Sequence, residues 1–207
     1  MVADSKQRAL LEAAARILAT DGPEALTMRR VAGEIGTSTM AVYTWYGGKA
    51  GLLRAVYLEA FTRFGDRLRA ERQGDDPLAD LLRLGRGYRD HALADPNLYA
   101  VMFGRVLGAW KPEAEDEEVA AGTFLLLLEA VERCVAAGVL TGEPAAVAMQ
   151  IWAAVHGAVS LEVDAPPEDP AGAGGTYWNL IRTVLVGLGA PPERLAAAGR
   201  LAGVPLP

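Results

Sequence analysis

The segment GTSTMAVYTWY, from Gly36 to Tyr46, constrains the fold of this chain more than its other stretches do. Within it, a short helix begins at a small hydroxyl residue, carries polar and aromatic groups outward, and ends at the pair Gly47–Gly48. Lys49 and the pair Leu52–Leu53 then begin another helical pattern. A short helix set behind a glycine turn is sized to enter the major groove of DNA.

Two further helices are predicted ahead of this segment. Apolar residues recur at helical spacing over residues 6–20, and the turn sequence at residues 21–23 stops that helix. Thr27 is a good N-cap for the second helix. Gly36 suits the tight turn into the third helix, which Ser38 is placed to cap. The order is that of a helix-turn-helix.

The first quarter of the chain resembles the TetR family of transcriptional regulators. The matching residues are Ala13-Ala14, Ile17-Leu18, Gly22, Leu26-Thr27, Val31-Ala32, Ile35-Gly36-Thr37-Ser38, Val42-Tyr43, Tyr46, Lys49 and Leu52-Leu53. Gly47–Gly48 and Ala50 depart from the usual residues of the family, which weakens the capping of the fourth helix. Later, Trp152, His156-Gly157 and Leu161-Glu162 are similar to a C-terminal subtype named for its Trp-His-Gly signature.

The resemblance implies an all-α protein with three parts. Residues 1–48 would form the DNA-binding head, residues 49–74 a connecting helix, and residues 75–207 an effector-binding and dimerisation domain. The charge layout agrees, since residues 1–74 hold 11 Lys and Arg against 8 Asp and Glu, whereas residues 75–207 hold 9 against 18. Chance fluctuation of charge is the alternative interpretation. The mildly basic head suits a DNA-binding end, although the whole chain carries a net charge of −6.

Candidate DNA-contacting residues divide by chemistry. The family match implies phosphate contacts by four residues with hydroxyl, indole N–H or ammonium donors: Thr27, Tyr43, Trp45 and Lys49. Base edges would be contacted by Thr37, Ser38, Thr39, Met40 and Thr44. Since the recognition helix has no Arg, Asn or Gln, few bidentate base contacts are available, and much of the specificity would come from DNA shape.

Aromatic and methionine side chains in the body are candidates for an apolar effector pocket. The predicted lining is Tyr99, Met102, Phe103, Trp110, Phe124, Trp152 and His156. Plain core packing is the alternative for each of them, and for His156 the alternative is a hydrogen-bonded buried imidazole. The helix that ends at Ala137 and holds the run Phe124–Leu128 is predicted to be the most buried element of the body. We expect no cofactor and no metal site, because no Cys, His and carboxylate spacing suggests one.

Two apolar helices in the last third suggest a homodimer. The predicted interface residues are Ala153, Gly157, Tyr177, Ile181, Val184 and Leu185. Two such helices from each of two chains would form a four-helix interface, and core helices of a monomer are the alternative. The uncharged run Pro144–Leu161 is interpreted as a buried helix of a soluble protein rather than a membrane span, since it includes Gln150, His156 and Ser160.

The sequence therefore predicts a cytoplasmic DNA-binding regulator, with one cysteine, Cys134, and so no intrachain disulfide. We expect a repressor that a small apolar or amphipathic effector releases from a near-palindromic double-stranded operator. One alternative is a ligand-binding or enzymatic helical protein that carries a helix-turn-helix. Against an enzyme, no nucleophile–base pair or phosphate loop is present in the sequence. Another alternative is a regulator whose body binds a protein and no ligand.

Overall fold

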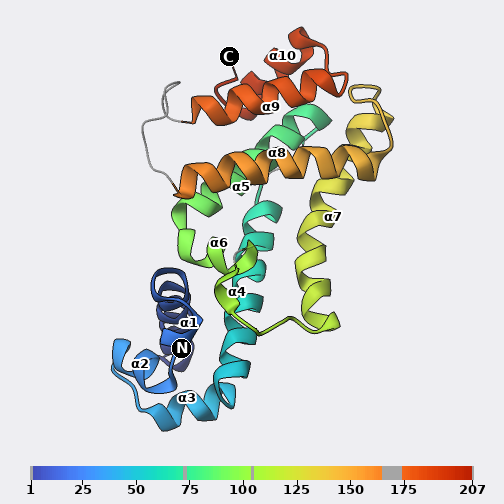
Figure 1. Ribbon diagram of the computed structural model, residues 1–207. Coiled ribbons are helices and arrows are strands. Elements are labelled where there is room, and N and C mark those ends of the chain that lie inside the picture. Colours follow the sequence, from blue (N-terminus) through green and yellow to red (C-terminus); the bar gives the residue numbers. More distant parts are fainter. Residues whose placement is uncertain (1, 72–73, 104, 165–173, 207) are drawn as a thin grey trace. The chain divides into compact units, whose positions relative to one another are not determined.

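The computed structural model describes residues 2–71, 74–103, 105–164 and 174–206, and this described part is built from helices without a strand (Figure 1). The predicted all-α class is confirmed. The helices are α1 (Val2–Asp21), α2 (Met28–Glu34), α3 (Thr39–Tyr46), α4 (Lys49–Arg69), α5 (Pro77–Ala94), α6 (Pro96–Phe103), α7 (Ala114–Ala136), α8 (Pro144–Asp164), α9 (Gly175–Gly187) and α10 (Pro192–Ala202). Short 3₁₀ turns occupy Pro23–Ala25 (η1) and Arg105–Leu107 (η2).

Two compact units make up the chain. The first comprises residues 1–65 and 94–121, and the second comprises residues 66–93 and 122–207. Helices α4 and α7 each contribute residues to both units. The division into a head, a connecting helix and an effector domain concerns function and stays a prediction.

The first unit gathers its core around α1, which packs against α2 and α6. Both predicted helix caps are confirmed. The Thr27 hydroxyl oxygen accepts the backbone N–H of Arg30 at 3.2 Å, and the Ser38 hydroxyl oxygen accepts that of Ala41 at 3.1 Å. Each cap satisfies a backbone donor that the first turn of a helix leaves without an intrahelical partner. Val42 of α3 is fully buried, which fixes the rotation of that helix.

Glycines shape both ends of α3. Gly36 has a φ of 63° in the turn before it, and Gly47, with a φ of 72°, ends it by donating its N–H to the Tyr43 carbonyl at 2.8 Å. A side chain would be strained at either position, because both are left-handed. Gly51, in the first turn of α4, is required for another reason. A Cβ there would overlap the carbonyl oxygen of Tyr46, so the bare glycine lets the end of α3 lie directly on α4.

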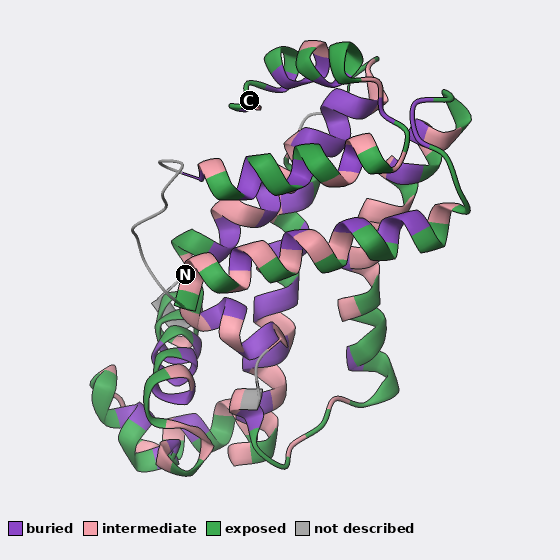
Figure 2. Cartoon of the chain, turned by 45° about the horizontal axis from the view of Figure 1, so that its top comes forward, coloured by how far each residue is buried: buried purple, intermediate pink, exposed green. Residues whose placement is uncertain are grey.

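The second unit contains the packed pair α8 and α9. Each buries one side and leaves the other open, as the purple and green faces of Figure 2 show. The buried residues are Val147, Ala148, Ile151, Val155 and Val159 of α8, and Tyr177, Trp178, Ile181 and Leu185 of α9.

The prediction that α7, the helix that holds Phe124–Leu128, is the most buried element of the body is wrong. Leu125 of α7 is 57% exposed, and the other four residues of this run are only half-buried. Five consecutive apolar residues surround a helix on all sides, and neighbouring helices of one chain cover only part of that circumference. The run Pro144–Leu161 was expected to form a buried helix. Helix α8 is instead buried along one face only.

Candidate DNA-binding and ligand sites

Most of the predicted base contacts in α3 and the turn before it are exposed. Met40 is 74% exposed, and Tyr43, a predicted phosphate contact, is 49% exposed. Of the other predicted base contacts, Ser38 and Thr44 are exposed, whereas Thr37 and Thr39 are half-buried. Residues three and four apart share one side of a helix, so positions 40, 43 and 44 form a single surface on α3.

Hydrogen bonds within the protein determine which donors and acceptors remain available to DNA on this surface. The Thr44 hydroxyl donates to the Met40 carbonyl oxygen at 2.9 Å. The caps Thr27 and Ser38 use their side-chain oxygens to accept backbone N–H groups, which leaves the hydroxyl hydrogen of each to donate elsewhere. Exposed hydroxyls at helix N-termini are well placed to donate to a phosphate.

Lys49 has a contact that the sequence did not indicate. Its ammonium donates to the Pro23 carbonyl oxygen at 2.6 Å, and so ties the start of α4 to the turn η1. Trp45 is half-buried and meets Tyr46 edge-on, with ring centroids 6.5 Å apart. Burial and the Glu59 carboxylate raise the pKa of Tyr46, so its phenol stays protonated at neutral pH. Lys49 and Trp45 are therefore part of the framework of the head, whatever they contact outside it.

A buried carboxylate joins α4 to the beginning of α7 within the first unit. Asp116 is fully buried and accepts the Nε–H of Arg54 at 2.7 Å. Its second oxygen accepts the Glu113 N–H at 3.1 Å, which caps α7. The hydrogen bond to Asp116 raises the pKa of Arg54. Sequence reasoning missed this pair, since nothing local relates two residues so far apart in the chain.

The predicted effector residues lie in two groups. Tyr99, Phe103 and Trp110 belong to the first unit, where Met102 is also buried. There Trp110 packs on Tyr57 with ring centroids 5.5 Å apart. The row of rings continues from Tyr57 to Phe61 at 4.9 Å, from Phe61 to Phe103 at 5.9 Å, and from Phe103 to Tyr99 at 5.2 Å. Tyr57 and Phe61 of α4 were not among the predicted residues.

The second group surrounds His156 in the second unit. The His156 ring stacks on Trp152 with ring centroids 5.4 Å apart, and Phe124 meets Trp152 edge-on at 6.5 Å. Tyr88 of α5 approaches His156, with 3.1 Å between its hydroxyl oxygen and Nδ1. Burial lowers the pKa of His156, which favours the neutral imidazole, and the tautomer of the ring sets which partner donates in its hydrogen bond with Tyr88.

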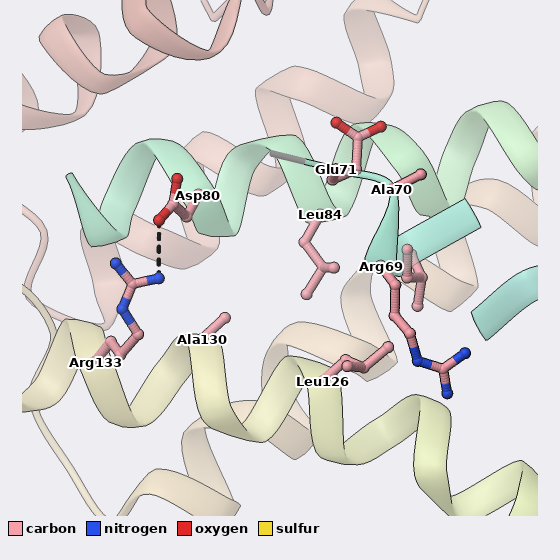
Figure 3. A pocket seen from close by; sticks show the side chains of 9 residues that line it. Arg69, Ala70, Glu71, Asp80, Leu84, Leu126, Ala130 and Arg133 are labelled. Carbon is pink, nitrogen blue, oxygen red and sulfur yellow. Dashed lines mark hydrogen bonds and ion pairs between the residues drawn. The ribbon is translucent and has the colours of Figure 1, made fainter. Parts of the chain in front are cut away.

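A cavity of about 490 Å³ lies elsewhere in the second unit, between the end of α4, α5 and α7 (Figure 3). Its lining consists of Leu68, Arg69, Ala70, Glu71, Asp80, Leu84, Leu126, Ala130 and Arg133. None of the seven predicted effector residues lines it. The sequence analysis selected aromatic residues, whereas this cavity is lined by aliphatic and charged side chains.

The predicted interface residues also divide by burial. Ala153 and Gly157 are exposed on the outer face of α8, and Val184 is half-buried. Tyr177, Ile181 and Leu185 are buried in the single chain, which leaves them no surface that a second chain could cover. Tyr177 is further fixed by donating its hydroxyl to the Gly85 carbonyl at 2.8 Å. The large exposed apolar residues of α8 and α9 are instead Met149, Leu161 and Leu180.

Helix α8 is also apolar and long enough to cross a membrane, and it is the one such helix in the described part of the chain. Burial covers 28% of its most apolar window. In the same described residues, no group of three or more His, Cys, Asp and Glu side chains could hold a metal ion.

Two parts of the chain match known protein domain families. Residues 10–56 match "Bacterial regulatory proteins, tetR family", and residues 81–181 match "Tetracyclin repressor-like, C-terminal domain". The second match does not confirm the Trp-His-Gly subtype, which stays a prediction.

Sequence relatives are regulators of the helix-turn-helix type. The "HTH-type transcriptional regulator Mb1846" of Mycobacterium bovis is 24% identical over 139 residues, which cover 65% of this chain and 57% of the relative. The chain thus spans a little over half the length of that relative. The "HTH-type transcriptional repressor DrrR1" of Streptomyces coeruleorubidus is 50% identical over 44 residues, 21% of this chain and 16% of that protein.

Solved structures show the same fold over most of the chain. A bacterial regulatory protein of the tetR family from Rhodococcus RHA1 has a TM-score of 0.73 at 21% identity, covering 90% of this chain and 98% of that one. The TetR family regulator PfmR from Thermus thermophilus has a TM-score of 0.71 at 18% identity, covering 87% and 97%. With a matching head and a matching C-terminal domain, the chain belongs to the TetR family of DNA-binding transcriptional regulators.

Proposed function

We propose that the chain is a cytoplasmic repressor that binds its operator as a homodimer and leaves it when a small effector binds. The observation that carries this proposal is the outward face of α3, where Met40, Tyr43 and Thr44 are exposed beside a capped N-terminus. A second support is the name of DrrR1, a transcriptional repressor that is 50% identical over its matched segment.

DNA contact divides between positioning and reading. Tyr43 and Thr27 donate hydroxyl hydrogens to phosphates, and Lys49 adds charge from the N-terminus of α4. Met40 and Thr44 face base edges, with Ser38, Thr37 and Thr39 at the turn. In a two-fold dimer, two such helices would reach successive major grooves roughly 34–36 Å apart, which requires a near-palindromic operator.

The outer face of α8 supports the dimer. Ala153 and Gly157 are exposed there, and a Cβ placed on Gly157 would meet nothing within 4 Å. Met149 and Leu161 leave apolar surface beside them, 50% and 73% exposed. Small residues let two helices approach closely, and a two-fold axis would pair the same face on both chains. Leu180 extends the interface onto α9 in place of the buried Tyr177, Ile181 and Leu185.

Release by an effector is supported by the course of α4. This helix starts at Lys49, directly after α3, and its last residues, Leu68 and Arg69, line the cavity of the second unit. A ligand with different affinities for two orientations of α4 would shift the balance between them, and operator affinity would shift with it.

Fluorescence anisotropy on the DNA that flanks the gene tests the proposal, at several salt concentrations and with excess nonspecific competitor. We expect tight, salt-sensitive binding that survives the competitor. The Tyr43→Phe variant should bind about fivefold more weakly, the loss of one hydrogen bond. Binding that the competitor abolishes, on flanking DNA and on sequences selected from a random pool, would contradict an operator-specific repressor.

A further inference from the structure

We infer that the cavity between α4, α5 and α7 binds an aliphatic carboxylate, a molecule with a saturated chain and an anionic head. The binding itself is independent of any role in regulation. Only its consequence for DNA, described below, rests on the proposed function.

The walls of the cavity determine the shape of the ligand. Figure 3 shows Leu84 pointing from α5 toward Leu126 and Ala130 of α7. Leu68 and Ala70 at the end of α4 complete the aliphatic part of a lining that contains no aromatic ring. A volume of about 490 Å³ is in the ordinary range for a small-molecule site. Flexible methylene groups fit such a surface, whereas the rings of planar ligands would find no aromatic partner on it.

The carboxylates that line the cavity are already paired with arginines. Asp80 is buried and accepts from the Gly74 N–H at 2.9 Å, from Arg83 at 2.5 Å and from Arg133 at 2.8 Å. Glu71 is almost as buried, and its two oxygens pair with Arg67 at 2.6 Å and Arg86 at 2.8 Å. Buried carboxylates that already pair with arginines are poorly available to a cationic ligand.

Arginine donors remain available at both ends of the cavity. In the described structure, Arg133 uses two N–H groups, one on Asp80 and one on the Gly74 carbonyl at 3.0 Å. Arg69 is 56% exposed and, among the described residues, pairs only with Asp66, at 3.1 Å. A guanidinium has five N–H donors, so both side chains can bind a further acceptor.

Charge favours an anion as well. Five arginines belong to this cluster, against four carboxylates, once Asp66 and the Asp90 that pairs with Arg67 are counted with Asp80 and Glu71. The unused arginine donors and this positive excess match a carboxylate, whereas an amine would add a further positive charge.

Calorimetric titration of the purified full chain with decanoate, decan-1-ol and decylamine, each below its aggregation concentration, tests the inference. We expect decanoate to bind most tightly. Ala130→Leu fills the cavity and should weaken decanoate binding by at least about tenfold. Ala136→Leu, an exposed alanine of the same helix, is the matched control and should leave binding unchanged. Arg69→Gln should weaken binding by about threefold, the effect of one rim charge, and Arg200→Gln on α10 should not.

Equal binding of decanoate and decan-1-ol, preferred binding of decylamine, or unchanged binding to Ala130→Leu would each overturn the inference. Operator anisotropy with and without decanoate separates it from the proposed function. If decanoate binds and Ala130→Leu abolishes the binding while operator affinity stays constant, the site stands and effector release through it fails. If no operator is found, the repressor proposal fails, while the titration still shows whether the cavity binds decanoate.

Discussion

Two exposed faces of this chain look alike in burial and differ in chemistry. On α3, Met40 and Tyr43 are 74% and 49% exposed, beside the hydroxyl of Thr44. On α8, Met149 and Leu161 are 50% and 73% exposed, in a run with no charged side chain from Pro144 to Leu161. The first face can replace its bonds to water with bonds to a polar partner. The second gains only when water is removed, so exposure alone does not tell which partner a face suits.

The two faces are also supported differently. Helix α3 has eight residues and depends on a side-chain cap, left-handed glycines and one close backbone contact. Helix α8 has 21 residues and is stabilised by an apolar face, from Val147 to Val159, that is buried against the rest of the chain. A single substitution should therefore disturb the first face far more easily than the second.

The largest effect is expected from Gly51→Ala. The new Cβ would overlap the Tyr46 carbonyl and push α3 away from α4, so operator affinity should fall at least about 30-fold, equivalent to about 2 kcal/mol. Anisotropy on operator DNA measures this loss. Gly33→Ala is the control, because a Cβ there meets nothing within 4 Å and a helical alanine is favoured over glycine. Equal operator affinity for the two variants would show that the contact at Gly51 does not position α3.

Gly157→Arg should be the next largest. An arginine on the outer face of α8 would meet its symmetry mate across a two-fold axis, and like charges in such positions cost several kcal/mol. Sedimentation equilibrium should show monomers, with helical content retained. Ala196→Arg, on the exposed side of α10, should remain dimeric. A dimeric Gly157→Arg protein would move the interface away from this face.

Lys49→Gln tests whether Lys49 contacts DNA or only stabilises the fold around α3. If the ammonium contacts a phosphate, the slope of log affinity against log salt should decrease by about one unit. If Lys49 serves only its bond to Pro23, the slope should stay constant while the melting temperature falls. Tyr43→Phe is the control, since removing a neutral hydroxyl changes affinity without changing the number of ions released.

The smallest effect concerns His156. Burial lowers its pKa in the folded protein below the ordinary value of 6.5, so the unfolded chain binds the proton more readily. The resulting stability is present above about pH 6.5 and is lost as the pH falls toward the folded pKa. Melting temperatures at pH 7.5 and 5.5 should differ more for the wild type than for His156→Gln. Equal pH dependence would exclude a contribution of this imidazole.

The head was predictable from sequence because its signals are local. Thr27 and Ser38 act on backbone groups three residues away, and the glycines act on their own dihedral angles. Gly51 escaped notice because a glycine inside a helix has no local signature when its role is to admit the end of another helix.

The body was less predictable because tertiary packing decides its inner faces. The residues Phe124–Leu128 are apolar in every direction, so the sequence does not say which side is covered. Tyr177 and Ile181 were assigned to the dimer interface for the same reason, although both are buried within the single chain. The cavity was missed because its lining is leucine, alanine and ion pairs brought together from three helices, a combination without sequence periodicity.

The hydrogen bond inside α3 has a consequence for the operator. The single hydroxyl hydrogen of Thr44 is committed to the carbonyl of Met40, so the oxygen faces outward with lone pairs alone. A base recognised by that oxygen must supply a hydrogen. In the major groove the exocyclic amino groups of adenine and cytosine do so, whereas guanine and thymine present acceptors there. While this hydrogen bond lasts, Thr44 should favour a base with an amino group, adenine or cytosine, over a keto base, guanine or thymine. This preference does not distinguish A·T from G·C base pairs.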